Sequence, residues 1–295
     1  MSSTATTSPM ERARFSDLAP GLGAAVSFSA ADVLGKVVFI SGMDVLSLVT
    51  LRGILAATFF WWWLRAYPPA VQHSRRQRRV AIWVGVLFAG NVFGLLLAIQ
   101  LLPLSIAILA YFIYPLLTGI SAAAFRLERL SWQSFACAFA AFCGLALMLG
   151  TQPGVLAPLG LLGAFGGAIC RTVSLLLMRA KLGGTDARLT TWYTLFPPAV
   201  IFVAMSLATR HFNPPVDSGG WFAFGGMTVA TTLSTLLIFI STTRVGAFRT
   251  AVLLNLEPVL SSAFSFTLLG EVTSEMQLVG GALMVLSLCA FQLRR

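Results

Sequence analysis

Long apolar runs alternate with short polar connections along the whole chain. A run of about 20 mostly apolar residues is long enough to cross the bilayer core as an α-helix. Ten such runs lie at 18–40, 45–66, 80–101, 103–125, 131–150, 156–178, 188–209, 219–241, 248–269 and 276–293. The pattern therefore predicts an all-α membrane protein with ten transmembrane helices, and it leaves no room for a soluble domain.

The composition supports this interpretation. Of the 295 residues, 57% are hydrophobic and only 10% are charged, whereas a soluble domain has about 25% charged residues. This excludes an ordinary soluble enzyme, a disordered chain and a disulfide scaffold. The net charge of +10 does not predict a nucleic-acid partner here, because most basic residues lie in short loops between apolar runs. We expect residues 1–17 to form a cytoplasmic tail and the first run to be retained.

The basic residues gather on one side of the predicted membrane. The only basic residue in the predicted loops on the other side is Arg210. The positive-inside rule then places both termini in the cytoplasm, as expected of a multi-pass protein of the cell inner membrane. The basic residues of the cytoplasmic side are Arg12, Arg14, Arg65, Arg75, Arg76, Arg78, Arg79, Arg126, Arg129, Arg179, Lys181, Arg188, Arg244, Arg294 and Arg295.

Two stretches of the chain repeat a pattern at a constant separation of 143 residues. Each half, 18–150 and 151–295, contains five predicted helices. Because five is odd, the second half is inverted relative to the first. Inverted repeats are typical of secondary transporters, whose substrate sites lie near the bilayer midplane between the repeats. The aligned pairs are Pro115 and Pro258, Glu128 and Glu271, and Ser131 and Ser274.

The segment NLEPVLSSAFSFTLLGEVTSEMQLVGGALMVLSL, Asn255–Leu288, resembles the signature of the EamA-like family of the drug/metabolite transporter superfamily. Pro115, Glu128, Gln133 and Gly144 form a weaker version in the first half. The resemblance covers essentially the whole chain. It implies a ten-helix permease in two five-helix repeats, a metabolite carrier whose central cavity is lined mainly by helices 1, 3, 4, 6, 8 and 9.

The first predicted helix departs from many relatives, which carry a Trp-Gly pair there. This chain has SFSAADVLGK instead, at Ser27–Lys36. The sequence is similar to a branch that includes carriers of riboflavin and S-adenosylmethionine. The resemblance alone therefore does not decide between an amino-acid exporter and a carrier of riboflavin or S-adenosylmethionine.

Six charged residues lie inside predicted helices. A charge near the bilayer centre costs about 2.5–3.5 kcal/mol, so such residues usually face a cavity or one another. We predict a cluster centred on Asp32, with Lys36 or Arg52, in the outer half of the membrane. The alternative is a static ion pair that joins helices 1 and 2. The six residues are Asp32, Lys36, Arg52, Arg171, Arg249 and Glu257.

Glu257 is the first candidate for proton or substrate coupling, and Asp32 is the second. Glu257 lies at the same predicted depth as Arg171, which makes the two plausible partners. Pro258 cannot donate a backbone hydrogen bond and leaves the Leu254 carbonyl free. The alternative is a kink with a structural salt bridge. Arg249 lies nearer the cytoplasmic rim, where a long basic side chain can reach the interface.

Polar and aromatic residues on other helices are candidates to line the cavity. Tyr111 and Tyr114, three residues apart, can share a helix face and flank a flat ring or a cation. Asn91 and Asn255 add amide groups, and Pro115 and Pro258 are expected to kink their helices. Separately, Gly90-x-x-x-Gly94 and Gly163-x-x-x-Gly167 predict close helix contacts.

The sequence contains none of the common catalytic or phosphate-binding motifs, so we expect neither an enzyme nor a cofactor or metal site. The combined interpretation is a secondary transporter that moves a small polar or aromatic metabolite, an amino acid or related compound, by alternating access, with export as the direction. An uptake carrier for riboflavin or S-adenosylmethionine-like metabolites is the alternative, followed by a channel or scramblase. The expected partners are the metabolite, the lipid bilayer and protons as coupling ion, for a monomer or homodimer.

Overall fold

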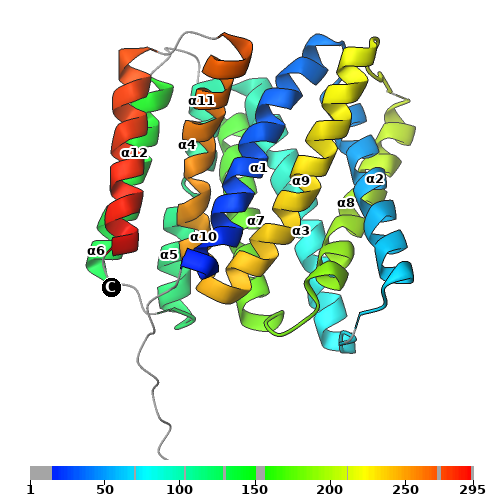
Figure 1. The fold of residues 1–295 in the computed structure, drawn as a ribbon, viewed down its shortest axis with the longest axis horizontal. Coiled ribbons are helices and arrows are strands. Elements are labelled where there is room, and N and C mark those ends of the chain that lie inside the picture. The colour runs from blue at the N-terminus through cyan, green and yellow to red at the C-terminus, as the bar shows by residue number, and fades with distance from the viewer. Residues whose placement is uncertain are drawn as a thin grey trace, which may run out of the picture.

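The computed structural model describes residues 15–293 except 70, 103, 129–130, 151–156, 211 and 271–273. The described part is helical and contains no strand. Figure 1 shows one bundle of near-parallel and antiparallel helices. They are α1 (Phe15–Ile40), α2 (Val45–Ala66), α3 (Arg75–Leu101), α4 (Leu104–Tyr111), α5 (Tyr114–Ala124), α6 (Trp132–Leu149), α7 (Pro158–Lys181), α8 (Ala187–Thr209), α9 (Ser218–Val245), α10 (Ala247–Leu254), α11 (Leu256–Leu269) and α12 (Glu275–Leu293).

These helices make ten crossings of the bundle. Within the described residues, nine helical stretches are long and apolar enough to span a membrane, and the stretch Glu275–Phe291 in α12 is apolar but shorter. The fourth and ninth crossings, predicted as single helices over 103–125 and 248–269, are each broken into two. The breaks lie at 112–113 and at Asn255, three residues before Pro115 and Pro258. A proline lacks the N–H group that would continue the helical hydrogen bonds.

The basic run that precedes the third crossing is part of a helix, whereas the apolar pattern predicts a loop there. The helix α3 begins at Arg75, because Ser74 forms a capping box with Gln77: each side chain bonds the backbone N–H of the other residue. This reciprocal pair satisfies two backbone donors of the first turn. The basic side chains therefore extend from the end of a helix, at the same end of the bundle as predicted.

The two halves of the chain run through the bundle in opposite directions. We call the end at which α1 begins and α12 ends the termini end, and the opposite one the loop end; they are at the bottom and the top of Figure 1. The helix α7, which opens the second half, begins at the loop end. Six residues named in the sequence analysis lie outside the described residues. Five of them support the predicted orientation, and the sixth is one member of a repeat pair: Arg12, Arg14, Arg129, Arg294, Arg295 and Glu271.

The outer surface of the bundle carries many large apolar side chains. Trp83 is 64% exposed, Leu207 74% and Phe222 84%. Large apolar side chains exposed in such number are unfavourable in water and are the surface that lipid chains cover. Together with the apolar crossings, it identifies a multi-pass membrane protein.

Glycines let α3 and α7 approach closely, as the two Gly-x-x-x-Gly patterns predicted. A Cβ atom on Gly94 would lie 2.5 Å from the backbone oxygen of Gly163, and one on Gly163 would lie 2.8 Å from the oxygen of Gly94. Backbone atoms cannot move aside as the end of a side chain can. The same kind of contact joins α6 to α12 at Gly144 and Gly280.

We expect Gly94→Ala to lower the free energy of unfolding by about 1–3 kcal/mol, because the new methyl group overlaps the backbone of α7. Thermal unfolding of the purified protein in detergent measures this loss. Gly166→Ala on α7 is the matched control, since a Cβ there meets nothing within 4 Å. Equal melting temperatures for the two variants would contradict the close contact.

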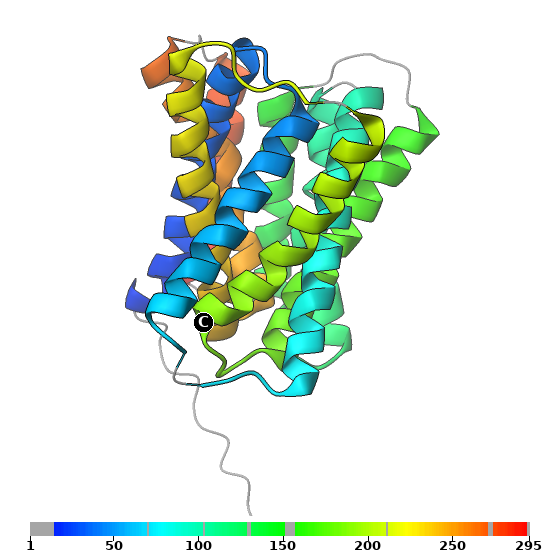
Figure 2. The ribbon, with the colours of Figure 1, turned by 90° about the vertical axis from the view of Figure 1, so that its right-hand side faces the viewer.

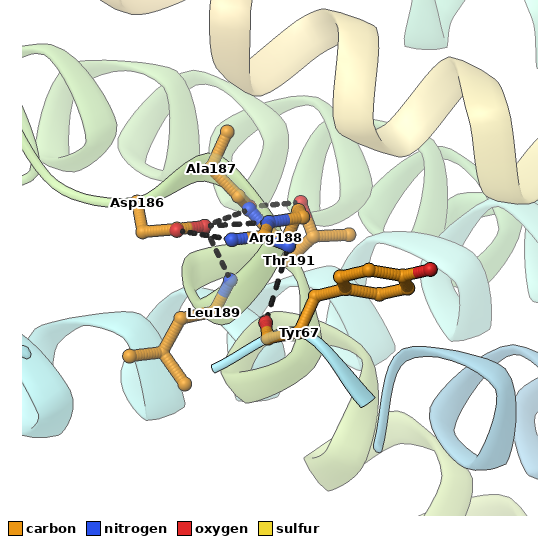
Figure 3. Close-up of polar contacts among 6 residues, drawn as sticks. All are labelled: Tyr67, Asp186, Ala187, Arg188, Leu189 and Thr191. Carbon is orange, nitrogen blue, oxygen red and sulfur yellow. Dashed lines mark hydrogen bonds and ion pairs between the residues drawn. The ribbon is translucent and has the colours of Figure 1, made fainter. Parts of the chain in front are cut away.

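Side chains brace the termini end between α2 and α8, which lie side by side in Figure 2. Arg188 pairs with Asp186 at 2.9 Å and donates to the backbone oxygen of Tyr67 at 3.3 Å, as Figure 3 shows. Burial raises the pKa of Asp186, but hydrogen bonds from Arg188 and from the N–H group of Leu189 outweigh it, and the pKa lies below its usual value. Asp186 thereby caps α8 as a carboxylate.

Candidate functional site

A cavity of about 610 Å³ lies inside the bundle. This volume is in the range of small-molecule sites. Residues of α1, α2, α3, α8, α9 and α11 form most of its wall, and the two broken crossings contribute Tyr111 and Glu257 beside their breaks. Lining residues such as Ile99 and Gln277 lie close to the loop end. The cavity therefore extends from the middle of the bundle toward that end.

The cavity brings together five of the six charged residues singled out in the sequence: Asp32, Lys36, Arg52, Arg171 and Glu257. Asp32 accepts a hydrogen bond from the Ser261 hydroxyl at 2.6 Å, and Lys36 donates to Ser265 Oγ at 3.1 Å. These two bonds join α1 to α11. The charge of Lys36 also acts on Asp32, whereas no ion pair within 4 Å joins Asp32 to Arg52 in the described part of the chain.

Glu257 and Arg171 share the cavity but do not form an ion pair. No ion pair within 4 Å joins them, although the charges of Arg171 and Asp32 both act on Glu257. The Arg171 guanidinium lies over the Tyr114 ring, 5.8 Å from its centroid. Arg171 is 8% exposed, and its Nε–H has no acceptor among the described residues. A buried donor without an acceptor is a polar group that a ligand can satisfy.

The other candidate residues differ in where they lie. Asn91, Tyr111, Tyr114 and Pro258 line the cavity. The Tyr111 and Tyr114 rings are 5.5 Å apart and tilted by 45°. The Oδ1 atom of Asn91 is buried without a hydrogen-bond donor.

Three candidates are not part of the cavity wall. Asn255 is buried at the break between α10 and α11, and its Oδ1 atom also has no donor. Pro115 lies at the start of α5, where it breaks the fourth crossing. Arg249 lies in the first turn of α10, toward the termini end.

Each broken crossing accepts a hydrogen bond beside its break, and the repeat relates the two bonds to each other. The sequence analysis did not predict these bonds. The Ser29 hydroxyl donates to the Glu257 backbone oxygen at 3.0 Å, and the Thr172 hydroxyl donates to the Tyr114 backbone oxygen at 3.2 Å. Ser29 and Thr172 are separated by 143 residues, as are Tyr114 and Glu257. The repeat therefore extends to individual bonds at the middle of the bundle. Applying the offset to hydroxyl residues of helix 1 would have found this signal.

The cavity is closed toward the termini end by contacts between the repeats. There α5 packs on α10, and a Cβ on Gly119 would lie 2.6 Å from the Phe248 ring. Similarly α3 packs on α8, where a Cβ on Gly85 would lie 2.6 Å from the Thr194 backbone oxygen. Two independent interfaces thus separate the cavity from this end.

Glu128 joins the same closure from the connection after α5. Its carboxylate accepts hydrogen bonds from the backbone N–H groups of Ala247 and Phe248, at the beginning of α10. Gly246 precedes them with φ +103, a conformation that favours glycine, and a side chain there would collide with Glu128. Burial raises the pKa of Glu128 above its usual value, against these hydrogen bonds and the charges of Arg179 and Arg249. The first repeat therefore caps a helix of the second.

The loop end differs, although the repeat relates its helices to those of the termini end. The counterpart of the α5–α10 pair is α11 with α4, and the counterpart of α3–α8 is α9 with α2. Among the described residues, α4 and α11 form no contact of comparable extent, and the contact of α2 with α9 is much smaller than that of α3 with α8. The equivalent interfaces are thus closed at one end of the cavity and apart at the other.

Comparisons with known proteins fit this architecture. The sequence profile of the EamA-like transporter family matches residues 18–150 and again 158–291. The chain belongs to the EamA-like transporter family. The two matches are the two repeats, and membership makes the chain one of a family of membrane transporters of the drug/metabolite type. The expected resemblance is confirmed.

A solved structure supports the fold of this EamA-like protein. A crystal structure titled only "Crystal structure of protein" aligns with a TM-score of 0.78 over 94% of this chain and 98% of the other, at 19% sequence identity. That likeness shows the fold alone. No protein with a curated description matches the chain.

Proposed function

We propose that this protein is a secondary transporter that moves a small polar or aromatic metabolite, an amino acid or related compound, by alternating access. One observation supports the proposal most: interfaces that the repeat makes equivalent are packed at one end of the charged cavity and not at the other. In an inverted repeat, exchanging the conformations of the two halves closes the open end and opens the closed one. The cavity then faces each side of the membrane in turn.

The orientation follows from charge. Arg65, the run from Arg75 to Arg79, and Arg188 are at the termini end, and the positive-inside rule assigns this end to the cytoplasm. The cavity of the present conformation then opens to the outside of a cell inner membrane. An outward-open cavity is one stage of an export cycle, at which substrate leaves, and equally the stage at which an uptake carrier loads.

Glu257 and Asp32 are the groups to which we assign coupling. Both carboxyl groups line the cavity at membrane depth, and the charge of one acts on the other. A proton taken up by either group changes the charge that the substrate meets. Proton binding and substrate binding are therefore linked, and a proton gradient can drive export.

Two alternative functions would use the same cavity. Uptake of riboflavin or S-adenosylmethionine-like metabolites requires an aromatic wall, which Tyr111, Tyr114 and Phe112 supply. A channel requires a continuous path, and the contacts at Gly119 and Gly85 close that path in this conformation. Exchange of labelled substrate, stimulated by unlabelled substrate on the opposite side, separates a carrier from a channel.

We expect Glu128→Ala to favour the conformation that opens to the termini end. Removing a helix cap costs about 1 kcal/mol, and the loss falls only on the closed conformation, which shifts the equilibrium roughly fivefold. The labelling rate of a cysteine introduced as Ala251→Cys measures the shift, since Ala251 is fully buried on α10. The native cysteines are replaced beforehand.

The matched control is Glu275→Ala, which removes an exposed carboxylate from the first turn of α12 at the loop end. It should leave the labelling rate at position 251 unchanged. Faster labelling in both variants would indicate general loosening of the bundle. Unchanged labelling in Glu128→Ala would contradict a role of this carboxylate in closing the cavity.

A further inference from the structure

The cavity wall carries more basic than acidic side chains, and one of the basic side chains has no acidic partner. Three cationic side chains, Lys36, Arg52 and Arg171, face two carboxyl groups, Asp32 and Glu257. Lys36 acts electrostatically on Asp32, and Arg171 acts on Glu257. With every group ionised, the wall carries one positive charge in excess.

Arg52 is the cation that remains without an acid. It lies on α2 about seven residues, or roughly 10 Å, from the loop end of that helix. No ion pair within 4 Å joins it to a carboxylate of the described residues. Its neighbour Gly53 packs directly against the backbone of Ala199 on α8, which fixes this turn of α2. An uncompensated charge at membrane depth is costly and usually marks a binding or ion pathway.

The deeper wall offers a place for the rest of a ligand. Tyr111 and Tyr114 present neighbouring rings, and the Nε–H of Arg171 is directed at no acceptor. The buried Oδ1 atom of Asn91 lacks a donor. A molecule with a ring and one or two polar groups would fill the aromatic wall and satisfy these atoms.

These observations point to one class of substrate, an inference that rests on the proposed function. We propose that the substrate is a small organic anion, whose carboxylate or phosphate group pairs with Arg52 while its ring lies against Tyr111 and Tyr114. Guanidinium groups suit both kinds of anion, because their planar donors form paired hydrogen bonds with two oxygens. The anion also balances the excess charge of the wall.

A matched ligand series tests the charge directly. Thermal unfolding of the full chain, purified in detergent, is measured with phenylacetate, phenyl phosphate, phenylacetamide, phenethylamine and phenylalanine. These share one ring and differ in charge. We expect an anion to raise the melting temperature and the neutral amide and the amine to have no comparable effect. The stronger of phenylacetate and phenyl phosphate names the anionic group.

Variants of Arg52 locate the site. Arg52→Gln should weaken binding of the stabilising anion by at least about tenfold, as loss of one partner of a desolvated pair does. Arg52→Lys keeps the charge but loses the paired hydrogen bonds of the guanidinium, so its affinity should lie between those of the unaltered protein and of Arg52→Gln. Arg65→Gln, near the other end of α2 and exposed, is the matched control and should bind normally. If Arg52→Gln does not fold, the ligand series on the unaltered protein and on Arg52→Lys still decides.

Several results would overturn the proposal. They are stabilisation by phenethylamine or phenylacetamide equal to that by the anions, stronger stabilisation by phenylalanine, unaltered anion binding in Arg52→Gln, and no stabilisation by any compound. None of these results depends on the labelling of position 251 or on substrate exchange. The ligand series can therefore contradict the anionic substrate while alternating access still holds. Alternating access is tested separately, by the labelling of position 251 and by substrate exchange.

Discussion

Proteoliposomes containing the Glu257→Gln variant should exchange substrate across the membrane but should no longer accumulate it in response to a pH gradient. We expect gradient-driven accumulation to fall at least about a hundredfold, or ~2.7 kcal/mol, with exchange within about threefold of the unaltered protein. The labelled compound is the strongest ligand of the phenyl series. Comparing accumulation with exchange in one preparation separates coupling from movement.

The expected difference follows from the place of Glu257 in the ninth crossing. Its side chain lines the cavity at the first turn of α11, where it can exchange a proton and meet the substrate. Its backbone oxygen, which accepts the Ser29 hydrogen bond, is unchanged by the substitution. Glutamine also has nearly the same shape as a protonated glutamate. The broken helix and the cavity should therefore persist, and only the proton site is lost.

Glu275→Gln is the control, because that carboxylate is exposed at the start of α12. Asp32→Asn, the equivalent neutral substitution for aspartate, tests the second candidate in the same assay. Full gradient-driven accumulation in Glu257→Gln with its loss in Asp32→Asn would transfer the coupling role to Asp32. Full accumulation in both variants would show that neither carboxyl group couples protons to transport.

The sequence alone predicted the ten crossings and the separation of the repeats, because both depend on local properties. Apolar runs long enough to span a bilayer have few alternatives to a transmembrane helix, and an offset of 143 residues can be read directly from aligned prolines. Pro115 and Pro258 also indicated kinks. The position of each break, three residues before its proline, was not predicted, because it depends on which tertiary partner satisfies the freed backbone.

The partners of the charged residues were predicted less well. Equal depth placed Arg171 and Glu257 in one cavity, but depth says nothing of rotation about the helix axis, and Arg171 lies over Tyr114 instead. Glu128 stood out only as a member of the repeat. Its bond to the beginning of α10 joins residues about 120 positions apart in the chain, and no helical period connects them.

The open and closed ends were also beyond the reach of the sequence. The repeat relates the helices of one end to those of the other, so the sequence pattern does not say at which end the equivalent interfaces are in contact. The contact between Gly119 and Phe248 illustrates this. Its counterpart at the loop end would be made by α4 and α11, which do not form such a contact here.

Holding α5 against α10 should abolish transport and leave ligand binding intact. Gly119→Cys and Phe248→Cys, in a chain freed of its four native cysteines, place two thiols where a Cβ on Gly119 already meets the Phe248 ring. A short bifunctional thiol reagent with a reducible linkage joins them. The cavity stays open at the loop end, so the ligand still raises the melting temperature, but the opposite conformation is no longer reached.

The control links two helices whose interface and its counterpart in the other repeat are both packed in this conformation. Leu34→Cys with Gly226→Cys links α1 to α9 outside the cavity wall, at a large interface whose counterpart, α3 with α7, is equally extensive. Since both members of this pair are packed in the same conformation, neither has to part during the cycle, and exchange should continue after linking. Exchange that survived the α5–α10 link would overturn alternating access through this interface. Loss that is reversed by cleaving the linkage would place the moving gate between Gly119 and Phe248.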